Sequence, residues 1–209
     1  MRYLPTGNWM QKADAHTIHE IGIPSLVLME RAALGIAEVI KSKVQKNKKI
    51  LIVCGSGNNG GDGFAIARLL HDENYSVVIA FVGKTESMSD ECKQQYCICK
   101  NIGISIETEI PAGEYGVIVD AIFGVGLCRE ISGKYASVIE CLNAMEGYKV
   151  AVDIPSGVSS LDGKILGIAF KADLTVSVQC EKSRNCSVSG KDLQESSCKS
   201  IGIIQNLSK

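Results

Sequence analysis

Hydrophobic and polar positions along the chain form blocks that predict strands and helices in turn. Short apolar runs, typical of buried strands, alternate with stretches in which apolar residues recur at helical spacing. The predicted strands cover residues 49–53, 76–82, 102–107, 116–120, 148–152 and 174–178. The predicted helices are two segments within 8–45, separated at 22–24, and then 65–73, 88–101 and 134–144. This alternation predicts an α/β protein with a mainly parallel sheet covered on both faces.

The second helical segment carries a wide apolar stripe between residues 26 and 40. Its members are Leu26, Val27, Met29, Ala32, Ala33, Ile36, Ala37 and Ile40. A stripe of this width covers a sheet or reaches a second subunit. Glu30 and Arg31 interrupt the stripe, and we expect them to be paired with each other or with neighbours because an unpaired buried charge is costly.

A glycine-rich segment, Val53-Cys-Gly-Ser-Gly-Asn-Asn-Gly-Gly-Asp-Gly-Phe64, lies between the predicted strand 49–53 and the predicted helix 65–73. Its five glycines lack a Cβ, so the backbone can adopt positive φ and a ligand can approach the main chain. The N–H groups at the start of the following helix can bind an anion. The alternative is a turn whose glycines only allow the helix and the strand to pack closely.

The spacing Gly55-x-Gly57-x-x-Gly60 matches the dinucleotide-binding fingerprint. That fingerprint also needs an acid near the end of the next strand, where it binds a ribose hydroxyl. Here the strand 76–82 runs into Gly83 and Lys84, and no carboxylate stands there. The segment is therefore expected to face phosphates, but the ordinary dinucleotide mode is disfavoured.

Three predicted strands, 49–53, 116–120 and 148–152, end in polar loops. In an open α/β sheet, ligands bind outside the carboxyl ends of the strands. We therefore expect one cleft lined by Asn58, Asn59, Asp62, Asp120, Asp153 and Ser156. Each residue also has a purely structural interpretation: Asp120 or Asp153 could cap a turn, and Pro155-Ser-Gly157 could only shape a loop.

Composition narrows the class of protein. A length of 209 residues fits a single domain over residues 1–209, and a net charge of −1 without a basic block argues against a nucleic-acid binder. No apolar run is long enough to span a membrane, and the N-terminus lacks the apolar core of a signal peptide. The nine cysteines are scattered without metal-binding spacing, which favours a reducing cytoplasm and no disulfides.

Three motifs together resemble one family. Gly55-Ser-Gly-Asn-Asn-Gly-Gly-Asp-Gly63, Asp120-Ala-Ile-Phe-Gly-Val-Gly-Leu127 and Asp153-Ile-Pro-Ser-Gly157 are similar to the signatures of the YjeF N-terminal domain family, which includes the NAD(P)HX epimerases. Leu28-Met-Glu-Arg-Ala-Ala33 and Lys171-Ala-Asp-Leu-Thr175 extend the resemblance over about residues 10–182. The resemblance implies a Rossmann-like three-layer α/β/α sandwich, usually a homodimer.

The activity implied by the resemblance is repair of damaged NADH and NADPH. Addition of water to the nicotinamide ring gives R and S hydrates at C6, NADHX and NADPHX, and the epimerase interconverts them so that an S-specific dehydratase can complete the repair. The resemblance implies potassium (K+) ligands at Asn59, Asp120 and Ser156, and on chemical grounds Asp153 is our candidate for the acid and base. The implied substrate contacts are Asn58, Asn59, Gly60, Gly61, Asp62, Gly124, Val125, Gly126, Leu127, Cys128, Arg129, Glu130 and Asp153.

The sequence departs from the family pattern after Lys182. Residues 183–199 are polar and lack the usual proline-containing turn, and only Ile201-Gly-Ile-Ile204 resembles a last strand. The dehydratase half to which many relatives are fused is absent from this sequence, so the chain is either free-standing or a domain of a longer protein. Two other functions remain open: a non-catalytic binding or scaffold module of the same fold, and an ordinary nucleotide-dependent oxidoreductase, which the missing acid disfavours.

Overall fold

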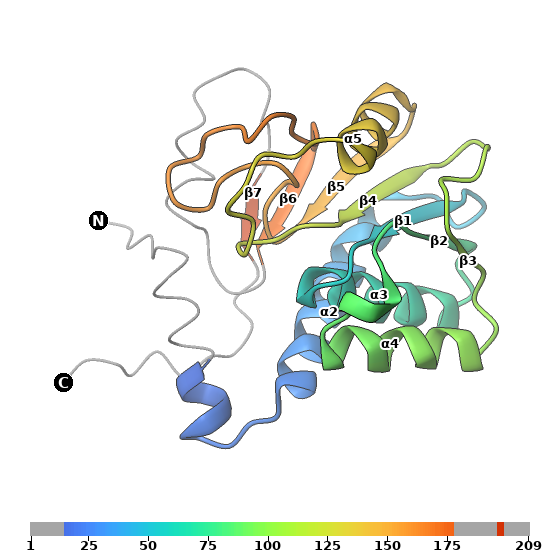
Figure 1. Cartoon of the computed structure of the whole chain (residues 1–209). Helices are drawn as coiled ribbons and strands as arrows, with labels where there is room; N and C mark the ends of the chain where they lie inside the picture. The colour runs from blue at the N-terminus through green and yellow to red at the C-terminus, as the bar shows by residue number, and fades with distance from the viewer. Residues whose placement is uncertain (1–14, 178–195, 199–209) are drawn as a thin grey trace.

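A computed structural model describes residues 15–177 and the backbone of residues 196–198 (Figure 1). Its seven strands form one sheet in the order β3-β2-β1-β4-β5-β6-β7, and every neighbouring pair is parallel. The strands are β1 Ile50–Cys54, β2 Val77–Phe81, β3 Ile106–Glu107, β4 Val117–Ala121, β5 Tyr148–Val152, β6 Leu174–Ser177 and β7 Ser196–Cys198. The strand order reverses between β1 and β4, which is where α/β sheets of this kind bind ligands.

Helices cover both faces of the sheet, so the expected three-layer α/β/α architecture is confirmed. Helices α2, α3 and α4 lie on one face, and α5 with residues 155–172 lies on the other (Figure 1). The bounds are α2 Ser25–Lys43, α3 Asn58–Asp72, α4 Asp90–Asn101, α5 Lys134–Ala144 and the short 3₁₀ helix η1 Thr85–Ser87. In β1, Ile50 and Ile52 pack towards α3, and Leu51 and Val53 pack towards the other face. Burial on both faces explains why β1 is a continuous apolar run.

The apolar stripe of α2 packs on the sheet from Met29 to Ile40, but Val27, which was expected to belong to it, is exposed. The two charges expected within the stripe have different environments. The Glu30 carboxylate forms an ion pair with Arg68 of α3, as pairing with a neighbour predicts. Arg31, in contrast, is exposed and lies outside the buried face, so the expectation that it shares this face is wrong. Helical geometry places residue 31 about 100° around the axis from residue 30, which is enough to turn it to solvent.

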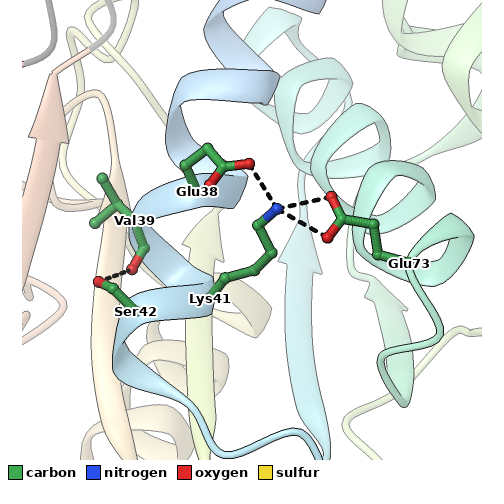
Figure 2. A network of polar contacts seen from close by, with 5 residues as sticks. All are labelled: Glu38, Val39, Lys41, Ser42 and Glu73. Atoms are coloured by element: carbon green, nitrogen blue, oxygen red, sulfur yellow. Dashed lines mark hydrogen bonds and ion pairs between the residues drawn. The ribbon is translucent and has the colours of Figure 1, made fainter.

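The carboxyl end of α2 is tied to the end of α3 by a lysine. The Lys41 ammonium lies 2.5 Å from the Glu38 carboxylate and 2.7 Å from that of Glu73, just past α3 (Figure 2). At the next residue, the Ser42 hydroxyl donates to the Val39 carbonyl at 2.6 Å. Of these contacts, only the Lys41–Glu73 ion pair joins the two helices, at the opposite end of α3 from the glycine-rich segment.

The predicted element bounds agree with the structure at α5 and β5 and differ elsewhere. Helix α3 begins at Asn58 and not at residue 65, so most of the glycine-rich segment is helical. The predicted strand 102–107 is reduced to β3 at the sheet edge. The strand expected at residues 201–204 and the start of the first helical segment lie outside the described residues. In the part of the chain that the structure describes, no helix has the length and apolar character needed to cross a bilayer.

Candidate active site

The glycine-rich segment is the end of β1 followed by the first turns of α3. None of its five glycines has a positive φ. The expectation that glycine serves here to let the backbone adopt positive φ is therefore wrong. A Cβ on Gly63 would lie 2.6 Å from the Cβ of Ala121 and 2.7 Å from the Cys54 sulfur. The helix therefore packs on the strands at a distance that only glycine allows at position 63. This agrees with the alternative in which the glycines allow close packing of helix and strand. At Gly57, the N-cap residue, a Cβ would meet nothing within 4 Å, so the backbone there is open.

Two predicted site residues from different motifs meet at Gly124. A Cβ on Gly124 would lie 3.2 Å from the Asp153 Oδ2 atom and 3.3 Å from the Asn59 Oδ1 atom. Asn59 belongs to the first turn of α3, and Asp153 directly follows β5; both are buried. The Asn59 Nδ2 atom is buried and has no hydrogen-bond partner among the described residues. A buried amide of this kind is ready to bind a further polar group.

Asp120 and Ser156 form a buried pair next to this point. The Asp120 Oδ1 atom accepts hydrogen bonds from the Ser156 hydroxyl at 2.6 Å and from the Ile122 N–H at 3.1 Å, and its Oδ2 atom accepts from the Ser156 N–H at 2.8 Å. The Ser156 hydroxyl oxygen in turn accepts from the Phe123 N–H at 2.9 Å. Because Phe123 directly precedes Gly124, this pair lies next in the chain to the glycine that both Asn59 and Asp153 approach.

The Asp120 carboxyl group is fully buried. Burial raises its pKa from 3.8 to about 6, although the hydrogen bonds from Ser156 and from the Ile122 backbone favour the ionised form and oppose that shift. Among the described residues no basic side chain forms an ion pair with Asp120, so a bound cation would stabilise the ionised carboxylate.

Asp153 has an unusual backbone. Its φ of 68° is one of two positive values among the described non-glycine residues. The Asp153 N–H donates to the Val176 carbonyl at 2.9 Å, and the Asp153 carbonyl accepts from the Ser177 hydroxyl at 3.3 Å. Hydrogen bonds to β6 thus hold the residue in a conformation that costs energy. Strain of this kind concentrates at functional sites.

The loop 124–130 follows β4 and carries seven of the predicted substrate contacts. Its Leu127 N–H donates to the Gly124 carbonyl at 3.3 Å, and the Ser160 hydroxyl donates to the Val125 carbonyl at 3.1 Å. The loop is mostly accessible: Gly126, Cys128, Arg129 and Glu130 are exposed, and Gly124, Val125 and Leu127 are half-buried. Sequence reasoning missed Ser160 and the Phe123 backbone, since neither residue type carries a signal for these bonds.

Other predicted contacts in the glycine-rich segment face the protein. A Cβ on Gly60 would lie 2.0 Å from the Gly55 carbonyl oxygen, and one on Gly61 would lie 2.7 Å from the Met29 methyl group. Asp62 is near α4, where burial and then the Asp62 charge raise the pKa of Cys92 to about 12. Asn58 is exposed at the start of α3. The structure thus brings together Asn59, Asp120, Gly124, Asp153 and Ser156, and it leaves Asp62 on the α4 side.

Comparison with known proteins shows the family of this chain. Residues 25–183 match the family described as YjeF-related protein N-terminus. The chain belongs to this family. Among its relatives, a protein of Limosilactobacillus fermentum named NAD(P)H-hydrate epimerase is 44% identical over 180 residues, which cover 85% of this chain and 86% of the relative. A protein of Oenococcus oeni with the same name is 41% identical over 171 residues, covering 81% of each chain.

A solved structure supports the fold. The crystal structure of yeast ynu0 superposes with a TM-score of 0.73 and covers 85% of this chain and 80% of the yeast chain. Its sequence identity of 22% limits that likeness to the architecture. The family expected from the three motifs is confirmed, and the matched residues, 25–183, include every element from α2 to β6.

Proposed function

We propose that this protein is an NAD(P)H-hydrate epimerase, which interconverts the R and S hydrates of NADH and NADPH. The observation that carries the proposal is the meeting of Asn59 and Asp153 at Gly124, beside the buried Asp120–Ser156 pair, at the carboxyl ends of β1, β4 and β5. The curated relatives that cover most of this chain have the same name. The substrate is a small dinucleotide, and the open backbone at Gly57 and the exposed loop 124–130 are the surfaces for its phosphates and nicotinamide end.

Asp153 is proposed as the acid and base. In the hydrate, C6 carries a hydroxyl group next to the ring nitrogen, whose lone pair can expel it. The Asp153 carboxyl group donates a proton to that oxygen, the C6–O bond breaks, and water and an iminium ring result. Water then adds to the opposite face of C6 and returns a proton to the Asp153 carboxylate, so the group ends as it began. Fixed by β6 in its strained conformation, the carboxylate is held ready for both steps.

The residues around Asp120 fit a potassium ion. A carboxylate has about four lone-pair sites, and three hydrogen bonds occupy sites on Asp120, which leaves one on Oδ2. The Ser156 hydroxyl accepts one hydrogen bond and keeps a second lone pair, and the Phe123 carbonyl oxygen is 3.3 Å from it. The Asn59 amide can turn its oxygen to the position of the unsatisfied Nδ2 atom, since the two are nearly isosteric.

These ligands suit a hard monovalent ion. Asn59 and Ser156 offer neutral oxygens and Asp120 a carboxylate oxygen, and no nitrogen or sulfur ligand is among the three. When bound, the ion would balance the Asp120 charge and hold the loops after β1, β4 and β5 together. If so, potassium should raise the melting temperature of the protein relative to tetramethylammonium at equal ionic strength, and Asn59→Leu should remove most of that increase.

We also propose a homodimer in the cytoplasm, working with a separate or fused dehydratase. Val27 and Leu34 of α2 are 46% and 47% exposed, and Ile21 just before the helix is 41% exposed. A second copy that packs on this side would bury them. Light scattering at micromolar concentration should give twice the mass of one chain, and the Leu34→Glu variant should have the mass of a single chain.

The activity is tested by incubating purified R-NADPHX with the protein and an S-specific dehydratase, with resolution of the isomers by chiral chromatography. The proposal predicts complete conversion to NADPH at a rate proportional to the protein concentration. If R-NADPHX disappears no faster than without the protein while added S-NADPHX is consumed, the chain is not an epimerase and the scaffold alternative is favoured.

A further inference from the structure

The segment that follows β2 lies directly beside the glycine-rich segment. The Val82 N–H donates to the Cys54 carbonyl at 3.0 Å, which extends the contact between the two strands beyond their ends. The Ser56 hydroxyl then bridges Lys84 in both directions: it accepts from the Lys84 N–H at 2.8 Å and donates to the Lys84 carbonyl at 3.0 Å. Lys84 is therefore held in register with Ser56, next to the open backbone at Gly57.

Gly83 makes this approach possible. A Cβ at position 83 would lie 2.2 Å from the Ser56 hydroxyl oxygen and 2.9 Å from the Ser56 nitrogen. No side chain other than hydrogen fits there without breaking the Ser56–Lys84 bridge. The position after β2 is thus built to bring residue 84, and not residue 83, to the glycine-rich segment.

The position of Lys84 after β2 matters for ligand binding, because β2 lies next to β1 in a sheet whose strand order reverses between β1 and β4. In dinucleotide-binding sheets of this order, the residue at the end of β2 reads the 2′ position of the adenosine ribose. An acid there binds the 2′-hydroxyl, and its absence disfavours that form of the dinucleotide mode here; a basic residue instead accommodates a 2′-phosphate. Here no acid stands between Val77 and Lys84, and the first charged side chain is the exposed ammonium of Lys84.

The Lys84 ammonium is available for such a contact. Among the described residues, none forms an ion pair with the Lys84 ammonium. An opposing charge stands two residues on, at Glu86, whose carboxylate accepts from the Thr85 hydroxyl at 2.9 Å. Hydrogen bonds from its own backbone N–H and from Thr85, and then the Lys84 charge, lower the pKa of Glu86. Glu86 is therefore ionised and partly offsets the charge of Lys84.

We propose that Lys84 recognises the 2′-phosphate of the substrate, and so makes the enzyme prefer the NADPH hydrate to the NADH hydrate. This inference rests on the proposed epimerase function for its biological meaning. Its physical content is independent: a lysine fixed beside the phosphate-facing end of β1 attracts a phosphate at the 2′ position of an adenosine ribose. A charge-assisted contact at an accessible site corresponds to about tenfold in affinity.

The binding test uses adenosine 2′,5′-bisphosphate and adenosine 5′-monophosphate as probes, measured by calorimetry at low salt. We expect the unaltered protein to bind the bisphosphate about tenfold more tightly than the monophosphate. Lys84→Met should remove that difference, and Glu86→Gln should enlarge it. Lys93→Met, at an exposed lysine of α4, is the matched control for net charge and should preserve it.

Adenosine 3′,5′-bisphosphate distinguishes recognition of the 2′ position from attraction of any added phosphate. Equal affinity for the two bisphosphates, or a preference for the 2′,5′ isomer that survives in Lys84→Met, would overturn the inference.

Kinetics separate this inference from the proposed function. With both hydrates as substrates, Lys84→Met should lower the ratio of kcat/KM for NADPHX to kcat/KM for NADHX by about tenfold, through KM. If both hydrates are epimerised and this ratio is the same in the variant, the role of Lys84 is wrong and the epimerase function stands. If neither hydrate is epimerised, the proposed function is wrong, and the bisphosphate measurement alone decides whether Lys84 recognises a 2′-phosphate.

Discussion

The buried carboxyl group of Asp120 should give the protein a measurable dependence of stability on pH. Its pKa is about 6 in the folded protein and 3.8 in a solvated aspartate. Each pKa unit corresponds to ~1.4 kcal/mol, so the difference of about two units corresponds to ~3 kcal/mol in the free energy of unfolding. Because the folded-state pKa is the higher one, the folded protein binds the proton more tightly. The stabilisation from this proton is fully present below pH 3.8 and is lost as the pH rises through 6.

The perturbation is Asp120→Asn, which removes the titration and keeps the shape. Urea unfolding of both proteins is measured in potassium-free buffer from pH 4 to pH 7.5, and the free energy of the variant is subtracted from that of the unaltered protein. Other titrating groups are common to both proteins and largely cancel. We expect this difference to fall by about 2–2.5 kcal/mol over the range, since the rest of the ~3 kcal/mol is gained only below pH 4.

Potassium should reduce the fall, because a cation beside Asp120 lowers its pKa. A difference that stays constant within about 0.5 kcal/mol, the scatter of a neutral surface substitution, would refute the reasoning about the buried carboxyl.

Three further predictions concern the site and its support. Asp153→Asn should keep binding the hydrate and retain its melting temperature, since asparagine tolerates positive φ, while turnover at saturating R-NADPHX falls about a hundredfold; a change in binding alone would indicate a purely structural role. Gly63→Ala should lower stability by about 1–3 kcal/mol because its Cβ would meet Ala121, whereas Gly57→Ala, the matched control at an open position, should change stability little; equal melting temperatures for the two variants would contradict the packing account. Replacement of potassium by tetramethylammonium should lower activity in the unaltered protein and have little further effect in Asn59→Leu, and unchanged activity without potassium would remove the ion from the proposal.

The spacing of apolar residues predicted most of the fold, because the buried strands are short apolar runs and the helices have apolar residues at helical spacing. The helix Lys134–Ala144 and the strand Tyr148–Val152 were predicted with the bounds that the structure has. The start of α3 was not, because glycine disfavours a helix interior by about 1 kcal/mol relative to alanine. Close packing of Gly63 on Ala121 and Cys54 overrides that local preference.

The candidate site was only partly predictable. The rule that ligands bind at the carboxyl ends of parallel strands identified the strand ends near which Asn59, Asp120 and Asp153 lie. It could not give the hydrogen bonds between Asp120 and Ser156, which are 36 residues apart, or the positive φ of Asp153. Both depend on how β4, β5 and β6 place their ends in space, which no local pattern encodes.

The central claim is that this chain inverts the configuration at C6 of a nicotinamide hydrate by loss and return of the hydroxyl group. The most direct measurement incubates pure R-NADPHX with the protein in oxygen-18 water, separates the isomers by chiral chromatography and weighs each by mass spectrometry. The account predicts that S-NADPHX forms faster than in the absence of protein and carries one oxygen-18 atom, and that Asp153→Asn slows its formation about a hundredfold. Formation of no S isomer above the uncatalysed rate, or of an S isomer without the label, would contradict it.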